Sequence, residues 1–490
     1  MRRASPFLAI ALAVVALLSA CAPPRRAVTG WVPYWSTDSG RTTIDTARDL
    51  LSEVSPFWYR ATGATALAND EPSADQSAVV AQARAAHLPL IPAVRDGMPA
   101  HGMAAVLADP AQRAAHVSAL VNLAVANGYA GIDLDYEQFA FADGTSSWAA
   151  TRPLWVQFIS ELGPALHARA KLLTVTTPPI YNGSGAPGSG YWVYDWGGIA
   201  PFIDRLRIMS YEFSSSSPGP MAPLWWVQQI VAHAVTVVPP SKVQVGVPAY
   251  GRSFVAGVTG TCPSGVVPDR YDVRNVNTAA LVQERGATPV RDPASGEMTF
   301  SYVETFTGPP PAAAATTTAA PPPAQVTCQV TRTVWYPDLD SMMAKAHLVG
   351  TYGISGIAQW ALGMEDPAQW KPLRDYAASL PHPGGTDAVG AVEVVVPVAG
   401  SQVIVGGWAF DPESDLPIQV AITTGAGRSV VLANGGRPDL ASAYPGMGPY
   451  HGFGYPVAAT RGRQSVCVEA IGIGNGATST PLGCTTVTVG

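Results

Sequence analysis

Three acidic residues alternate with apolar residues in one short stretch, Gly-Ile-Asp-Leu-Asp-Tyr-Glu, at positions 131–137. In a β-strand, alternate side chains lie on the same face, so Asp133, Asp135 and Glu137 share one face. If the strand belongs to a barrel that helices cover from outside, these carboxylates must point inward. Glu137 then lies at the carboxyl end of its strand, where the active sites of such barrels are found.

This carboxylate row, Asp133, Asp135 and Glu137, predicts acid–base chemistry. Three inward carboxylates cannot all ionise cheaply in a medium of low dielectric constant. We expect the two aspartates to share a proton, and the neighbouring negative charge to keep Glu137 protonated near neutral pH. A protonated glutamic acid at the mouth of a barrel can donate to a departing glycosidic oxygen. An exposed acidic strand and a metal site are the alternatives that the pattern leaves open.

The elements that must position this row form a repeating pattern over residues 28–380. Eight short apolar runs occur there, and most end in polar or aromatic residues; helical patterns separate most of them, the clearest at 109–128 with Asp109 as its cap. Eight β/α units are the number that closes a parallel (β/α)8 TIM barrel of the α/β class. An open doubly wound sheet would fit any five or six of these runs, but their regular spacing favours the barrel. The runs are 28–35, 53–60, 89–94, 129–137, 171–177, 205–213, 243–251 and 356–363.

An insertion interrupts the barrel pattern between its seventh and eighth runs. Residues 252–334 are too many for a βα loop, so we expect a small inserted subdomain there. Within it, 309–323 is a Pro/Ala/Thr-rich tract that cannot build a core and predicts an extended loop.

The pattern changes again after a linker at 381–388. Residues 389–490 contain short period-two strands with frequent Gly and Pro, which predicts a small all-β, sandwich-like accessory domain. Its Asp411, Glu413 and Asp415 suggest an acidic surface turn, with a calcium site as the alternative.

The N-terminus predicts export. Two arginines precede an apolar run at 7–18, which is too short to span a bilayer and indicates a signal peptide over 1–20. The run ends in Leu-Ser-Ala-Cys, which resembles the lipobox of bacterial lipoproteins and predicts lipidation of Cys21. We therefore expect a protein anchored to the cell membrane and facing the cell wall, on a tether at 21–27 that reaches ~25 Å. An ordinary signal peptide with a chance cysteine is the alternative.

The bulk composition excludes several classes of function. Of the 490 residues 47% are hydrophobic and 13% charged, which excludes general disorder, and the net charge of −6 without a basic block argues against nucleic-acid binding. Four cysteines remain besides Cys21; the pairing that respects the expected domains is Cys262–Cys328 with Cys467–Cys484. No Cys/His spacing suggests a metal site, and we expect no metal or cofactor. Nothing in the sequence indicates an oligomeric state.

Four motifs resemble those of glycoside hydrolase family 18, the chitinase family. Residues 131–137 resemble its DxDxE signature, 209–212 (Met-Ser-Tyr-Glu) its M-x-Y-D run, 246–252 (Gly-Val-Pro-Ala-Tyr-Gly-Arg) its seventh-strand motif, and 359–363 (Gln-Trp-Ala-Leu-Gly) its eighth strand. The resemblance covers the whole barrel and implies a TIM barrel with an insertion before the last strand.

One residue departs from the family pattern. Family members commonly have Asp where this chain has Glu212. Tyr-Glu is usual in the spore-germination branch, which residues 209–223, 31–35 and 55–59 also resemble. Relatives in that branch cleave N-acetylglucosaminyl bonds in peptidoglycan.

The resemblance also implies roles for individual residues. The family uses the 2-acetamido group of its substrate in place of a second carboxylate. Glu137 would be the acid and then the base, Asp135 would stabilise the oxazolinium intermediate, Asp133 would hold Asp135, and Tyr211 would contact the acetamido carbonyl. The expected substrate-binding residues are Trp360, Glu212, Met209, Tyr250, Trp31, Tyr34 and Trp58.

These observations predict a glycoside hydrolase that cleaves β-linked N-acetylglucosaminyl bonds, with peptidoglycan or its fragments as the polysaccharide partner. A chitinase acting on chitin oligosaccharides is one alternative, and a lectin that binds glycans without cleaving them is another. A third possibility makes residues 389–490 the functional part, binding a wall polymer or a protein.

Overall fold

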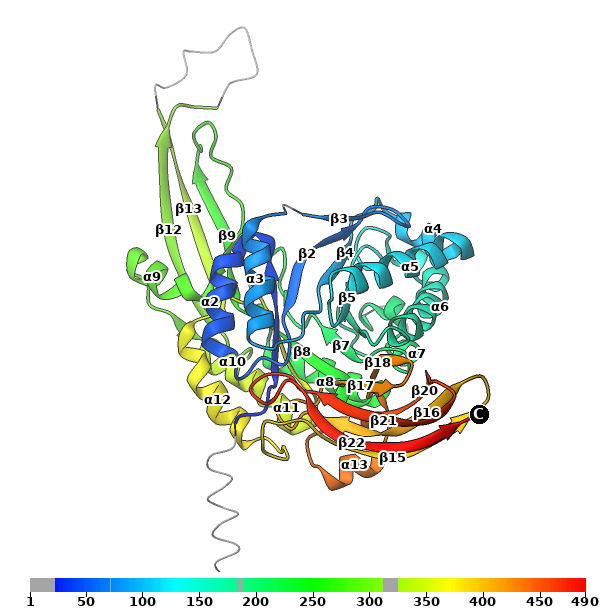
Figure 1. Ribbon diagram of the computed structural model, residues 1–490. Helices are drawn as coiled ribbons and strands as arrows, with labels where there is room; N and C mark the ends of the chain where they lie inside the picture. Colours follow the sequence, from blue (N-terminus) through cyan, green and yellow to red (C-terminus); the bar gives the residue numbers. More distant parts are fainter. Residues whose placement is uncertain (1–22, 71, 183, 185–187, 312–324) are drawn as a thin grey trace, which may run out of the picture.

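The computed structural model describes residues 23–70, 72–182, 184, 188–311 and 325–490. Its centre is a closed barrel of eight parallel strands in the order β1-β14-β8-β7-β6-β5-β4-β2, closed by pairing of β1 with β2 (Figure 1). The predicted TIM barrel is confirmed. The strands are β1 (Val28–Pro33), β2 (Ser55–Ala61), β4 (Ala93–Asp96), β5 (Gly131–Asp135), β6 (Leu172–Thr177), β7 (Arg205–Ile208), β8 (Val243–Pro248) and β14 (Gly356–Trp360), with β3 (Leu67–Asn69) antiparallel beside β2.

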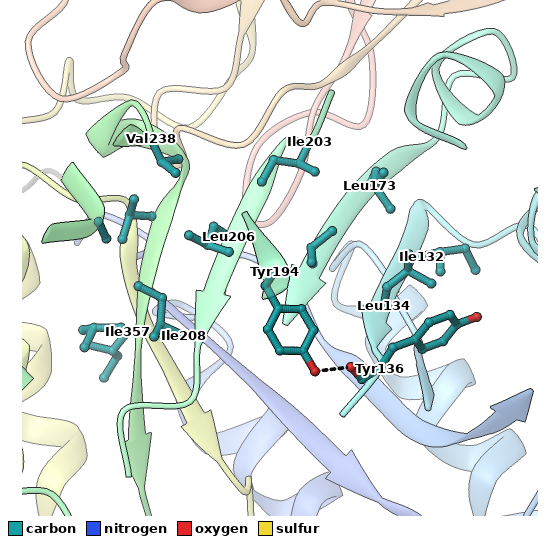
Figure 2. Packing of buried hydrophobic residues seen from close by; sticks show 14 of the residues in the cluster. Ile132, Leu134, Tyr136, Leu173, Tyr194, Ile203, Leu206, Ile208, Val238 and Ile357 are labelled. Atoms are coloured by element: carbon teal, nitrogen blue, oxygen red, sulfur yellow. Dashed lines mark hydrogen bonds between the residues drawn. The ribbon is translucent and has the colours of Figure 1, made fainter. Parts of the chain in front are cut away.

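Helices surround this barrel and receive the outward side chains of its strands. On β5, Ile132 and Leu134 point outward into the main hydrophobic cluster, together with Tyr136 beyond the strand (Figure 2). In the described ranges, no helix is both long and apolar enough to cross a membrane. The helices are α2 (Thr37–Ala47), α3 (Ala74–Ala85), α4 (Gly102–Ala108), α5 (Pro110–Ala126), α6 (Trp148–His167), α7 (Trp196–Ile199), α8 (Leu224–Val237), α10 (Leu339–Ala346), α11 (Leu348–Tyr352) and α12 (Trp370–Ser379).

Two local predictions meet different outcomes. The α5 helix begins as expected, because the Asp109 side chain accepts hydrogen bonds from the first free backbone N–H groups. The strand expected at 89–94 instead begins at Ala93. Pro89 and Pro92 have no N–H to donate, so the regular ladder of β4 starts only after Pro92.

The insertion forms a five-stranded antiparallel sheet in the order β10-β9-β13-β12-β11. Its three long strands project from the barrel as a ribbon (Figure 1). The predicted Cys262–Cys328 disulfide (S–S 2.08 Å) links the segment just after β9 to β13. Most of the 309–323 tract lies outside the described residues. The elements are β9 (Tyr250–Gly260), β10 (Tyr271–Arg274), α9 (Asn275–Arg285), β11 (Val290–Arg291), β12 (Met298–Gly308) and β13 (Val326–Tyr336).

The C-terminal region forms two four-stranded antiparallel sheets around a second hydrophobic cluster. The predicted Cys467–Cys484 disulfide joins β21 and β22 (S–S 2.10 Å). One sheet contains β15 (Val389–Val398), β16 (Gln402–Phe410), β20 (Tyr450–Ala458) and β19 (Gly435–Gly436); the other contains β18 (Gly427–Leu432), β17 (Gln419–Thr424), β21 (Gly462–Ile471) and β22 (Thr480–Val489), and α13 (Pro438–Ala443) precedes β20.

This C-terminal sandwich covers the floor of the barrel, the end at which the parallel strands begin (Figure 1). Leu416 and Leu432 from the sandwich pack in one buried cluster with Ile91 and Leu172 from the barrel. Gln419 Nε2 also donates to the Ala170 carbonyl at 2.9 Å. The end of the barrel opposite the floor is therefore the end left free for an active site.

Buried ion pairs reinforce this contact and correct the prediction for the acidic turn. Asp415 ion-pairs with Arg25 and Arg205, each at 2.9 Å, and all three side chains are buried. Asp411 and Glu413 are buried as well. The turn is therefore neither the surface turn nor the calcium site considered above. Asp415 and Glu413 face arginines that lie far away in the sequence, and Asp411 accepts hydrogen bonds from backbone N–H groups.

The first described residues belong to the same contact. Arg26 is buried and faces Glu413 at 3.6 Å, and the Arg26 backbone N–H donates to the Glu413 carbonyl at 2.7 Å. The tether expected at 21–27 is thus wrong for its last three residues, which pack between the barrel and the sandwich.

We expect Asp415→Asn to lower the free energy of unfolding by ~3 kcal/mol, because it leaves Arg25 and Arg205 buried without their counter-charge. Denaturant unfolding measures the change. Asp375→Asn is the matched control: Asp375 pairs with Lys371 on the exposed face of α12, and its loss should cost less than ~0.5 kcal/mol. Equal effects of the two substitutions would contradict the importance of the buried contact.

Candidate active site

The carboxylate row lies where the alternation on β5 predicts. Asp133 and Asp135 are buried inside the barrel, and Glu137 follows the last residue of β5 by two positions. Asp135 and Glu137 border a cleft of about 480 Å³ at the carboxyl ends of the strands. Its other lining residues are Trp31, Phe57, Phe141, Thr176, Pro178, Pro179, Tyr181, Tyr191, Met209, Tyr211, Glu212, Phe213, Ser215, Trp226, Tyr250 and Trp360.

Asp133, the deepest carboxylate, is held by three donors. Its Oδ2 accepts from Arg207 Nη1 at 2.8 Å and Trp31 Nε1 at 3.0 Å, and its Oδ1 accepts from Thr176 Oγ1 at 2.8 Å. The expected sharing of a proton with Asp135 has no counterpart in these contacts, because the hydrogen bonds of Asp133 go to other partners.

Sequence reasoning missed the two charged residues that accompany Asp133. The Arg207 guanidinium is fully buried and also ion-pairs with Glu53, which is fully buried as well. Arg207 further donates to Gln244 Oε1 at 3.0 Å. The alternation of β7 places Arg207 on the inner face, which is the signal that could have found it; Glu53 precedes β2 and has no such signal.

Asp135 and Glu137 form the electrostatic centre of the site. Burial raises the pKa of Asp135 well above its usual value, and the charges of Glu137 and Asp133 add to the rise. Burial, followed by the charge of Glu212, raises the pKa of Glu137 to about 7, while Arg95 opposes this rise. Arg95 on β4 lies beside Asp135 on the neighbouring strand β5. Glu137 can therefore carry a proton near neutral pH.

A rigid layer supports the strand behind Glu137. The Tyr194 hydroxyl donates to the Tyr136 carbonyl at 2.5 Å (Figure 2), and the Tyr136 hydroxyl lies 2.6 Å from His116 Nε2. Both tyrosines are fully buried. These contacts fix the backbone immediately before the acid and leave its side chain facing the cleft.

The turn after β7 brings a second polar group to the cleft. Burial raises the pKa of Tyr211 well above its usual value, so its hydroxyl stays protonated. A Cβ on Gly246 would lie 2.3 Å from the Ile208 carbonyl oxygen and 3.0 Å from the Tyr211 ring. Only glycine therefore allows β8 to approach Tyr211 this closely.

Glu212 adopts an unusual backbone conformation at this turn. Its φ of 61° lies in the left-handed region, which is strained for a residue with a side chain. Tyr250 Oη and Arg252 Nη2 each donate to Glu212 Oε1 at 2.6 Å. These two donors from β9 hold the carboxylate in the cleft and compensate the strain.

Aromatic side chains build one wall of the cleft around Trp360, the last residue of β14. Its ring lies 4.6 Å from that of Phe57 and 5.7 Å from that of Trp31. Trp35, which is 46% exposed, approaches Trp360 at 6.4 Å. Such faces suit the apolar face of a sugar ring.

Two expected sugar contacts are wrong. Trp58 is buried among the outer core residues, because its neighbour Phe57 points into the cleft and adjacent side chains of a strand point to opposite faces. Phe57 lines the cleft in its place. Tyr34 packs against the same outer core and does not line the cleft.

Five further aromatic residues line the cleft, and sequence reasoning did not identify them as sugar contacts. The loops after β5, β6 and β7 supply Phe141, Tyr181, Tyr191 and Phe213, and the first turn of α8 supplies Trp226. Across the described residues, no group of three or more His, Cys, Asp or Glu side chains is arranged to hold a metal ion.

A closed (β/α)8 barrel with a buried carboxylate row that ends in an acid whose pKa lies near 7, beside an aromatic cleft, has the architecture of a glycoside hydrolase. Comparison with protein families agrees. The model of the glycosyl hydrolases family 18 matches residues 92–365, and the chain belongs to this family.

Relatives within the family are distant. An uncharacterized glycosylase of Bacillus subtilis, YvbX, is 26% identical over 260 residues, which are 52% of this chain and 63% of that protein. A cortical fragment-lytic enzyme of B. subtilis is 22% identical over 252 residues, 51% of this chain and 50% of that enzyme. The chain thus spans less than two thirds of the length of either relative.

Among solved structures, a chitinase from Chromobacterium violaceum superposes with a TM-score of 0.57 and 25% identity, covering 71% of this chain and 98% of the chitinase.

The pKa of Glu137 predicts the alkaline limb of the pH profile. Because the acid must be protonated, kcat/KM should fall as pH rises through about 7. Glu212→Gln removes a negative neighbour and should move this limb to lower pH by ~1 unit, whereas Arg95→Gln removes a positive one and should move it to higher pH. Shifts in the same direction would contradict these electrostatics.

Proposed function

We propose that the protein hydrolyses β-linked N-acetylglucosaminyl bonds by retaining, substrate-assisted catalysis. The observation that carries this proposal is the position of Glu137, a carboxyl with a pKa of about 7 that faces the cleft beside Asp135 and Tyr211. No second carboxylate is needed as a nucleophile, because the family resemblance implies that the 2-acetamido group of the substrate is itself the nucleophile.

In the first step, Glu137 donates its proton to the glycosidic oxygen while the acetamido carbonyl oxygen attacks C1. The bond from C1 to the leaving oxygen breaks, and a cyclic oxazolinium ion forms. The Asp135 carboxylate accepts a hydrogen bond from the acetamido N–H and balances the positive charge of the oxazolinium ion. The Tyr211 hydroxyl orients the acetamido oxygen. Trp360 stacks under the sugar ring that reacts.

In the second step, Glu137 acts as the base. Its carboxylate takes a proton from water as the water oxygen attacks C1 and opens the oxazolinium ring. The product has the β-configuration of the substrate, and Glu137 regains its proton. One side chain serves as acid and base because its pKa lies near neutral pH.

For the polysaccharide we propose peptidoglycan or its fragments. Glu212 in place of Asp, with its two donors from β9, supports this choice, because it matches the spore-germination branch that the sequence resembles. The similarity to a cortical fragment-lytic enzyme supports the same class of substrate. Chitin oligosaccharides are the second candidate, supported by the 25% identity to a chitinase over most of that enzyme.

We also propose export and anchoring to the cell membrane through lipidated Cys21, which lies outside the described residues. Arg25 is buried against the sandwich at the barrel floor, so only three residues, or at most ~14 Å of extended chain, separate it from the anchor. The cleft lies at the opposite end and would face away from the membrane, toward the wall. An acyl mass on Cys21 is expected, and unmodified mature protein in the medium would contradict the proposal.

Product analysis tests the activity. Protein lacking residues 1–21 should release fragments from purified peptidoglycan that end in reducing N-acetylglucosamine, detected by mass spectrometry. Glu137→Gln should slow their release by about 10²–10⁴-fold, because the neutral amide cannot donate the proton.

Chitin oligosaccharides, assayed in parallel, separate the candidates. Cleavage of chitin alone would make the protein a chitinase. No products from either polymer, with glycan binding intact in both proteins, would contradict hydrolysis and establish a lectin.

A further inference from the structure

One arginine lies in the barrel centre beneath the cleft. Arg207 is the third residue of β7, and its guanidinium bridges Glu53 and Asp133. It lies 5.4 Å from the centre of the Trp31 ring, which also borders the cleft. Its remaining hydrogen bonds go to neutral side chains: Ser55 at 2.6 Å, Gln244 at 3.0 Å and Thr29 at 3.0 Å.

The contacts of Asp133 favour its charged form. Both partners of Oδ2, the Arg207 guanidinium and the Trp31 indole, can only donate hydrogen bonds. A proton on this oxygen would face two other hydrogens. Oδ1 already accepts from Thr176. Burial raises the pKa of Asp133 to about 7, although the hydrogen bonds from Thr176 and Trp31 oppose the rise. The Arg207 guanidinium at 2.8 Å adds the attraction of a full opposite charge, which favours the carboxylate beyond the effect of these hydrogen bonds.

The charged and titratable groups around Asp133 are few. Arg207 approaches from β7, Glu53 lies beyond the guanidinium, and Asp135 follows on the same strand. From β4, Arg95 acts on Asp135. The side chains that β1 and β6 direct to Asp133 are neutral: Trp31 and Thr176. Tyr211, which follows β7, also interacts with the charge of Asp133, and its raised pKa keeps it neutral.

We propose that Arg207 is a positioning residue that holds Asp133 as a permanent carboxylate, so that the one mobile proton of the carboxylate row moves only between Asp135 and Glu137. Asp135 lies between these two carboxylates, and its buried Oδ1 has no hydrogen-bond partner. The fixed negative charge of Asp133 keeps a proton close to Glu137 before substrate binds, and it adds to the field that stabilises the oxazolinium ion once Asp135 is ionised.

This inference rests on the proposed function for its mechanistic meaning, but its first test needs no substrate. In protein labelled with ¹³C at the aspartate carboxyl carbons, the signal that is absent in Asp133→Asn identifies Asp133. We expect this signal to keep the chemical shift of a carboxylate from pH 8 to pH 5. Titration with a midpoint inside this range would overturn the proposal, whether or not the protein cleaves glycans.

A paired variant supplies the second test. Glu53→Gln with Arg207→Gln removes one charge of each sign and leaves only Asp133 without a counter-ion. Because the guanidinium contacts Asp133 directly and Glu53 lies beyond it, the loss of the cation dominates. The acidic limb and the alkaline limb of the plot of kcat/KM against pH should then both move to higher pH by ~1 unit. The ¹³C signal of Asp133 should now titrate between pH 8 and pH 5.

Arg207→Lys is the conservative control. It keeps the positive charge, so both limbs should stay within ~0.3 units of the parent even where kcat falls. Lower activity of the paired variant with unmoved limbs would reduce Arg207 to a structural role and overturn the proposal. If the paired variant does not fold, the titration of the parent protein decides alone.

Discussion

The guanidinium of Arg207 allows two carboxylates to lie buried in the centre of the barrel. A buried carboxylate without a counter-charge costs several kcal/mol, yet Glu53 and Asp133 are both fully buried. Arg207 compensates both from one position. The cleft above depends on this arrangement, because Asp133 also fixes Trp31, which in turn contacts Trp360. Charge pairing below the site thus helps to set the aromatic wall that a sugar would contact.

A second set of buried charges fixes the other end of the barrel. The sandwich packs directly on the floor of the barrel. An apolar cluster and the ion pairs of Asp415 with Arg25 and Arg205 hold it there. This arrangement closes the end where the strands begin and leaves the end with the carboxylate row open. The C-terminal domain is therefore part of the support of the barrel, which weakens the alternative in which it is an independent functional module.

Sequence periodicity was sufficient for the barrel and the carboxylate row, whereas Tyr211, Glu212 and Trp360 were expected only from motifs that resemble the family. Alternation along 131–137 placed the carboxylate row correctly, and eight apolar runs gave the barrel. The position of Trp58 near a strand end predicted a sugar contact, but alternation puts it on the face opposite Phe57, which lines the cleft.

The buried charges could not be predicted for a different reason. Arg207 and Glu53 are 154 positions apart, and Arg25 and Asp415 are 390 apart. Glu53, Arg25 and Asp415 look like surface charges in their local sequence, and the alternation that marks Arg207 as inward-facing does not reveal its partners. Only the closure of the barrel and the docking of the sandwich bring the opposite charges together. The residues next to Asp415 in the sequence therefore predict a surface position for it.

The anomeric configuration of the first product tests the central claim most directly. Proton NMR of a chitin or peptidoglycan oligosaccharide during its initial cleavage distinguishes the β-anomer from the α-anomer before they interconvert. Attack by the acetamido group followed by attack of water predicts the β-anomer, because two inversions restore the original configuration. The α-anomer as the first product would show direct attack by water and would contradict the account built on Glu137 and Asp135.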